Sequence, residues 1–336
     1  MEKHIFVNVP LIKRSFLQRL FRQYPSDNAI IEVNNLLAIH CPQDISIQEI
    51  QAIQQKYEVD LGAQYGLNLQ EFYAVLWNHY VVAEEWSLEF KQQANQLAVL
   101  FKLDPAVTTE LKNKIGAGPY RQAAITYLSK RRLLTYDRAS LEELASQLEL
   151  SEEISTRIVA EQKQKVIDGY VKILMQKNRC THDELREAER MTDNFQTPAP
   201  LKKQLLQQLR VLVSYWEAEH QPLSAIAIAE GVLQKNETCY FWAPNAQWYE
   251  TRSRGYGSPE LELINKGAVY VTSKRLMFIA EVKTAQIPLE RILKVQMGPK
   301  GLNVIKDKGK NPVLGLGPAT EILQIVITRV IAGEHS

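Results

Sequence analysis

Two alternating apolar runs meet at a turn in one stretch of the C-terminal third, Lys266-Gly-Ala-Val-Tyr-Val-Thr-Ser-Lys-Arg-Leu-Met-Phe-Ile279, and this stretch decides the fold there. β-Branched and aromatic residues dominate both runs, which predicts two strands joined at Thr272-Ser-Lys-Arg275. Tyr270 and Phe278 are expected to pack together across this hairpin. Other short β-favouring runs lie between residues 239 and 305, separated by Gly, Pro, Asn and Lys. The sequence therefore predicts antiparallel strands from about residue 236 onward.

The final segment changes periodicity. After Gly317-Pro318 the apolar residues are spaced as on one face of an amphipathic helix, at Ile322, Leu323, Val326, Ile327 and Val330. Antiparallel strands followed by one C-terminal helix are the layout of a pleckstrin-homology-like (PH-like) β-barrel. The hairpin, then Ile287-Pro-Leu-Glu-Arg-Ile-Leu-Lys-Val295 and Gly301-Leu-Asn-Val-Ile305, resemble in order the GRAM and bacterial PH-like domains. The resemblance covers about residues 232–331 and implies a barrel closed at one end by the helix.

The first two-thirds of the chain carry helical signals instead. Three capping boxes are predicted, in which a hydroxyl and a carboxylate satisfy backbone N–H groups at a helix start: Ser46-Ile-Gln-Glu49, Ser140-Leu-Glu-Glu143 and Thr181-His-Asp-Glu184. An offset of 47 residues also superimposes apolar and aromatic positions, such as Tyr73 on Tyr120 and Leu97-Ala98 on Leu144-Ala145. A third copy continues the pattern more faintly. This predicts stacked helix-turn-helix repeats.

One of these helical units resembles a second family. The stretch Leu133 to Glu153 is similar to the helical unit of tellurite-resistance-associated (TerB-like) domains, a resemblance that covers about residues 70–210. Such loops in that family usually carry acidic metal-binding residues. Here the loop begins Lys130-Arg-Arg132, with cations where acids are needed, so metal binding is not carried over. We expect no metal and no cofactor.

Composition excludes several classes of protein. The chain has 336 residues, 45% of them hydrophobic, which is too many for intrinsic disorder. Forty basic residues against 38 acidic ones give a net charge of +2, which is unlike a dedicated nucleic-acid-binding protein. The charge is uneven, because residues 236–336 hold 13 basic and 9 acidic residues. We expect no nucleic-acid partner.

The cysteines, the N-terminus and the length of the apolar stretches together predict the cellular location. Its cysteines, Cys41, Cys180 and Cys239, form no CxxC pair, and the N-terminus has no signal-peptide pattern. The longest apolar stretches fall short of the roughly 18 residues that a membrane-spanning helix needs. We therefore expect a cytoplasmic protein, with peripheral contact to a membrane left open.

Two basic features are candidate binding sites. Lys274 and Arg275 at the hairpin turn, with Arg252 and Arg254 on a preceding strand, are candidate ligands for an anionic lipid headgroup. The favoured interpretation is that the Thr-x-x-Arg turn serves the fold and that its cations are solvated. The second feature, Leu11 to Arg22, has five apolar residues opposite four cations. We expect a helix packed on the helical region, with an anionic membrane as the alternative.

Catalytic patterns are absent from the sequence. It holds no GxSxG, no P-loop, no kinase signature and no His/Cys spacing typical of zinc ligands. We therefore expect no enzyme and no catalytic residues, and the leading hypothesis is a bacterial scaffold or adaptor that binds a protein partner. Peripheral binding to anionic lipid through the PH-like domain is the first alternative. A metal-dependent enzyme with a dispersed site is the second.

The predicted organisation is α+β and multidomain: an all-α region of helix-turn-helix repeats, then a PH-like β-barrel with a closing helix. Its parts are an N-terminal helical segment (1–70), a helical domain with the 47-residue repeat (71–220), a linker or helix (221–235) and a PH-like, GRAM-like domain (236–333).

Overall fold

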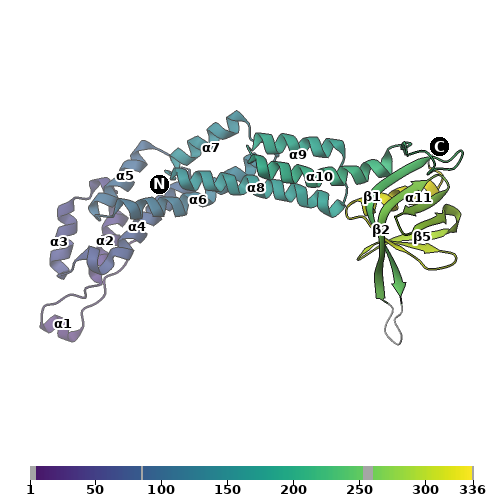
Figure 1. Ribbon diagram of the computed structural model, residues 1–336. Helices are drawn as coiled ribbons and strands as arrows, with labels where there is room; N and C mark the ends of the chain where they lie inside the picture. The colour runs from purple at the N-terminus through teal and green to yellow at the C-terminus, as the bar shows by residue number, and fades with distance from the viewer. Residues whose placement is uncertain (1–4, 85, 253–259, 335–336) are drawn as a thin grey trace. The chain divides into compact units, whose positions relative to one another are not determined.

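The computed structural model describes residues 5–84, 86–252 and 260–334 (Figure 1). The architecture is α+β: helices fill most of the chain up to residue 220, and a sheet with one final helix follows. The described α-helices are α1 Phe16–Leu20, α2 Asn28–Ile39, α3 Ile47–Tyr57, α4 Leu61–Ala83, α5 Leu88–Leu100, α6 Pro105–Leu128, α7 Thr135–Gln147, α8 Glu152–Lys177, α9 His182–Asn194, α10 Ala199–His220 and α11 Ala319–Ile331.

Seven strands form a single antiparallel sheet among the described residues. They are β1 Cys239–Arg252, β2 Glu260–Thr272, β3 Arg275–Ile279, β4 Thr284–Pro288, β5 Ile292–Gly298, β6 Gly301–Lys306 and β7 Val313–Gly315. Two single-turn 3₁₀ helices complete the elements, η1 Pro42–Asp44 and η2 Leu289–Arg291.

Contacts divide the chain into two compact units, Met1–Val166 and Ile167–Ser336. The division falls inside α8 rather than at one of the predicted domain boundaries. In helical repeat proteins each repeat contacts its neighbours alone, so few contacts cross any one point of the chain. A division by contacts does not show which parts of the chain fold on their own. The four predicted domains therefore remain predictions.

The helix boundaries have the period that the sequence shows. Helices α5, α7 and α9 begin at residues 88, 135 and 182 and each have 13 residues. Helices α6, α8 and α10 begin at residues 105, 152 and 199. Successive starts in both series are 47 residues apart, including those of the third pair.

The ends of the helices repeat in the same way. Left-handed residues with positive φ follow α4, α6 and α8 at Glu84, Arg131 and Asn178, and follow α5, α7 and α9 at Lys102, Glu149 and Gln196. A left-handed residue after a helix lets backbone N–H groups reach the last carbonyl oxygens and stops the helix. These positions are also 47 residues apart, so each short turn is built alike.

Two of the three predicted capping boxes are confirmed. Ser46 with Glu49 opens α3, and Thr181 with Glu184 opens α9. The prediction at Ser140 was wrong, because that residue lies inside α7. There Asp137 accepts a hydrogen bond from the backbone N–H of Leu134 (2.8 Å), and the helix starts six residues earlier than expected, at Thr135 and not at Leu141.

The N-terminal segment departs most from the sequence prediction. The expected packed helix over Leu11 to Arg22 is reduced to α1, which has five residues and buries none of them. In Figure 1 the loop that carries α1 extends away from α2 and α3. The apolar stripe is present as predicted, but the structure places it in contact with solvent.

The sheet has the strand order β4-β3-β2-β1-β7-β6-β5. The predicted barrel is therefore not closed, because β4 and β5 lie at opposite ends of this order. Pro288 ends β4 without a backbone N–H to donate, and η2 separates the two strands. Helix α11 packs against the sheet, with Leu323, Val326, Ile327 and Val330 in its core. The predicted C-terminal helix is confirmed, although it packs on an open sheet and not on a closed barrel.

Hydrogen bonds join helix α10 to α11. Arg329 of α11 donates hydrogen bonds of 2.7 Å to the carbonyl oxygens of Ala218 and Gln221, at the end of α10. The Tyr215 hydroxyl donates to the carbonyl of Pro318 (3.1 Å), just before α11. The last carbonyls of a helix have no partner within it and are negatively polarised, so a guanidinium suits them.

Candidate functional site

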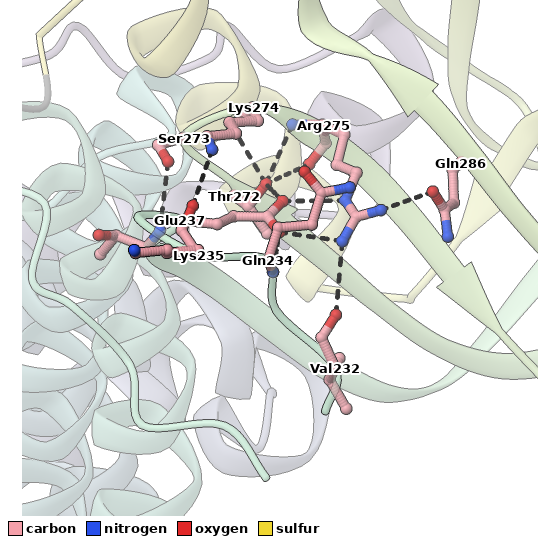
Figure 2. Close-up of polar contacts among 10 residues, drawn as sticks. Val232, Gln234, Lys235, Glu237, Thr272, Ser273, Lys274, Arg275 and Gln286 are labelled. Atoms are coloured by element: carbon pink, nitrogen blue, oxygen red, sulfur yellow. Dashed lines mark hydrogen bonds and ion pairs between the residues drawn. The ribbon is translucent and has the colours of Figure 1, made fainter. Parts of the chain in front are cut away.

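The predicted lipid ligand Arg275 lies in a hydrogen-bond network at the β2–β3 turn (Figure 2). Its Nε atom lies 2.9 Å from Oε1 of Glu237, and its Nη2 atom lies 2.9 Å from Oε2. The Glu237 side chain is fully buried and that of Arg275 is 11% exposed. This two-point pairing of guanidinium and carboxylate is the strongest geometry available to such an ion pair.

Thr272 completes the contacts of this ion pair. Its hydroxyl donates to Glu237 Oε1 (2.6 Å) and accepts from the backbone N–H groups of Arg275 (3.0 Å) and Lys274 (3.2 Å). Arg275 Nη1 also reaches Gln286 Oε1 on β4 (2.6 Å). Threonine and arginine of the Thr-x-x-Arg turn are thus both bonded to one buried carboxylate.

The same network holds the segment that precedes the sheet. Glu237 accepts from the backbone N–H of Gln234 (2.7 Å), and Arg275 Nη2 approaches the carbonyl of Val232 (3.4 Å). Lys274 is exposed, and its ammonium donates to the carbonyl of Lys235 (3.0 Å). The segment of residues 221–238 is not helical, and these bonds fix its last turn against β2 and β3.

The electrostatics of Glu237 favour its charged form. Burial raises the pKa of the carboxyl, but hydrogen bonds from Arg275, Thr272 and the Gln234 backbone outweigh burial and hold the pKa below its usual 4.5. The carboxylate is therefore ionised at neutral pH and cancels the charge of Arg275. This pair stabilises the fold, and four of the five Arg275 N–H groups already donate to protein acceptors, which leaves little of the guanidinium for a headgroup.

The structure does not gather at one place the three predicted lipid ligands that it describes, Arg252, Lys274 and Arg275. Arg252 is exposed at the far end of β1, while Cys239 at the other end pairs with Thr272 beside the turn. Since β1 has 14 residues, Arg252 lies roughly 40 Å from the turn at about 3.3 Å per residue. Beyond Tyr249 the β1–β2 arm pairs with no other described strand (Figure 1). Arg254 lies outside the described residues.

Sequence reasoning missed the free edge of β5. Within the described part of the chain this strand has one strand neighbour, β6, and its pairing is regular from Lys294 to Gly298. Helix α11 packs against β5, and Val295 packs on the core. Leu293 is 68% exposed and Met297 is 42% exposed. The edge thus offers backbone hydrogen-bonding groups next to exposed apolar side chains.

Other chemically reactive groups are committed to the fold. Burial raises the pKa of the Cys180 thiol to about 11 and also raises that of Cys239, so both are protonated at neutral pH. Arg179 pairs with Glu219 and, at 3.0 Å, with Glu321, which joins the start of α9 to α10 and α11. No cluster of three metal-binding side chains occurs within residues 5–84, 86–252 and 260–334.

Comparisons with known proteins give no family for the chain. No family model matches it, and no curated protein and no solved structure matches it either. None of the helices that the structure describes is long and apolar enough to cross a membrane.

Proposed function

We propose that the protein is a non-enzymatic scaffold or adaptor that binds a protein partner through a PH-like module and a helical domain. The order of the seven strands and the packing of α11 on the sheet support the PH-like assignment of the β-rich region. The free edge of β5 is the observation that carries the proposal, because it is a surface for recognition that the fold leaves open.

An extended segment of the partner adds to this edge as a further strand. Backbone hydrogen bonds to such an edge supply affinity, and side-chain contacts at alternate positions supply specificity. Lys294 is exposed on β5, and the irregular pairing between Ile292 and Lys294 shortens the usable edge. Both features discourage indiscriminate strand pairing. The regular part, from Lys294 to Gly298, together with the exposed Leu293 just before it, is the proposed site for one partner.

The helical repeat supplies the scaffold. Helix pairs begin every 47 residues from α5 to α10, a spacing typical of helical repeats. Such arrays commonly serve as binding surfaces for other proteins, because every repeat adds area of the same kind. In this proposal the array positions the PH-like module and its bound partner.

The test is an affinity capture with the tagged full-length chain from a lysate of the source cell. We expect the wild type to retain a stoichiometric protein partner, and the double variant Leu293→Glu/Met297→Glu to lose it. Two buried carboxylates beside the added strand would be desolvated without partners, which weakens binding at least tenfold.

A matched control separates this edge from general surface effects. Leu263 (46% exposed) and Val282 (90% exposed) are apolar residues elsewhere on the same module, and Leu263→Glu/Val282→Glu should retain the partner. Capture of no stoichiometric protein by the wild type contradicts the proposal. Equal capture by the β5 variant and the wild type contradicts the assigned edge.

A further inference from the structure

The N-terminal loop, defined as Leu11 to Tyr24, exposes more adjacent apolar side chains than its short helix can bury. Exposed fractions in α1 and the next residue are 76% for Phe16, 63% for Leu17, 65% for Leu20 and 67% for Phe21. These four residues are spaced i, i+1, i+4 and i+5, so they lie on one face of the turn of helix. Leu11 and Ile12 at the base are also exposed.

This loop is fixed at its base. The buried side chain of Asn28 on α2 accepts from the backbone N–H of Ile12 (2.7 Å) and donates to its carbonyl (2.9 Å). Asn35 makes the same pair of bonds with Val9 (2.7 and 2.8 Å). These bonds fix the base of the loop to α2 at Val9 and Ile12.

The loop also carries four cations. Lys13, Arg14, Arg19 and Arg22 lie in the loop, and residues 5–26 contain no acidic residue. Arg14 lies over the Tyr24 ring at 4.3 Å, and Arg19 Nε donates to the Arg14 carbonyl (3.2 Å). Two of the cations are thus held at the neck of the loop, next to an exposed aromatic ring.

An exposed apolar segment with cations beside it is suited to the surface of a lipid bilayer. In a bilayer, apolar side chains enter the acyl boundary while Lys and Arg remain at the level of anionic headgroups. Tyrosine side chains also prefer this interface, and Tyr24 at the neck of the loop would lie there. A protein partner would need a deep pocket for four large side chains together with a strongly acidic rim. The charge of the loop and its extension away from α2 and α3 (Figure 1) favour the bilayer.

We propose that the N-terminal loop is a membrane-docking site that inserts Phe16, Leu17, Leu20 and Phe21 into the surface of an anionic phospholipid bilayer. This site is separate from the β5 edge and does not depend on partner binding there. It is also distinct from a headgroup site at the β2–β3 turn, because it uses insertion of apolar side chains as well as charge.

The test is flotation of the full-length protein with vesicles of phosphatidylcholine mixed with phosphatidylserine, at low salt. We expect the wild type to float with these vesicles and to remain behind with pure phosphatidylcholine. The variant Phe16→Ser/Leu17→Ser should lose at least tenfold in affinity, because two large side chains no longer leave water. Each cation near such a surface adds about fivefold, so Arg19→Gln/Arg22→Asn should lose roughly 30-fold.

Matched substitutions control for general effects. Leu67 (80% exposed) and Val82 (75% exposed) lie on α4, and Leu67→Ser/Val82→Ser should float like the wild type. Asparagine at position 22 accepts the positive φ of 55° found there. Circular dichroism of each variant verifies that it is folded.

Three results would overturn the inference. The first is no flotation of the wild type with the anionic vesicles. The second is flotation of Phe16→Ser/Leu17→Ser equal to that of the wild type. The third is a stoichiometric acidic protein that is captured through these residues while vesicles are not bound, which would make the loop a protein-docking site.

Discussion

The β2–β3 turn and the N-terminal loop both place arginine next to apolar sequence, yet they use it in opposite ways. At the turn, Arg275 is bonded at two points to a fully buried carboxylate. In the loop, Arg19 and Arg22 are exposed, and no acidic residue lies within the segment that carries them. One arginine stabilises the fold and the other two remain available to a partner.

The difference shows that the partner of a basic residue decides its role. Glu237 lies 38 positions before Arg275, so only the folded chain brings the two together. Burying an unpaired guanidinium would be very costly, whereas the buried pair is neutral overall. Exposed cations contribute little to stability, because water and salt already screen them. The following predictions test this contrast, from the largest expected effect to the smallest.

Arg275→Ala should destabilise the β-rich region by about 3–5 kcal/mol, because it leaves the Glu237 carboxylate buried without its counter-ion. The measurement is urea unfolding followed by tryptophan fluorescence, since Trp242 and Trp248 lie in β1. Lys274→Ala is the neighbouring control and should cost less than about 1 kcal/mol, because that side chain is exposed. Equal losses for the two variants would contradict the assignment.

Acid should remove the contribution of Glu237. Its pKa is below 4.5 in the folded chain, so the ionised carboxylate adds stability above its unfolded pKa. That stability is lost as the pH falls through the lower folded pKa. The difference in unfolding free energy between the wild type and Glu237→Gln should therefore shrink between about pH 6 and about pH 3. Other carboxylates contribute equally to both proteins, so a constant difference would refute the prediction.

Asn28→Ala should free the base of the N-terminal loop. Two hydrogen bonds to Ile12 are lost at a buried side chain, which lowers the unfolding free energy by about 1–2 kcal/mol. Limited trypsin digestion should then cleave faster after Lys13 and Arg14. The control is Asn35→Ala, whose bonds to Val9 are exposed and should matter less. Unchanged cleavage rates would show that the loop is not held by Asn28.

Arg22→Asn should change the unfolding free energy by no more than about 0.5 kcal/mol, because it alters an exposed side chain with no ion pair in the described structure. Asparagine also tolerates the left-handed backbone at this position. The same urea unfolding assay applies. A loss as large as that expected for Arg275→Ala would mean that the two regions do not differ in the proposed way.

Local patterns in the sequence predicted local structure. The spacing of apolar residues located α11, and hydroxyl–carboxylate pairs located the starts of α3 and α9. These features depend on residues within one or two turns of each other, so the sequence contains them directly. The 47-residue spacing is visible for the same reason, because each copy repeats its own turns and caps.

Features that depend on strand register or on distant residues were not predicted correctly. Tyr270 pairs with Met277, and Phe278 pairs with Val269, so the expected packing of Tyr270 on Phe278 was wrong. A shift of one residue in register moves a side chain to the other face of a sheet. The open β5 edge depends on strand order, and the exposure of α1 depends on what α2 and α3 leave uncovered. Neither the open edge nor the exposure of α1 can be inferred from residues close in the sequence.

One measurement tests the central contrast most directly: a titration of the full-length protein with phosphatidylserine-containing vesicles, comparing two pairs of substitutions. Arg19→Gln/Arg22→Asn removes two cations from the N-terminal loop, and Arg252→Gln/Lys274→Gln removes two exposed cations from the β-rich region. We predict a loss of roughly 30-fold in affinity for the first pair, and less than about twofold for the second. A larger loss for the second pair would contradict the account and place the anion-binding surface on the sheet.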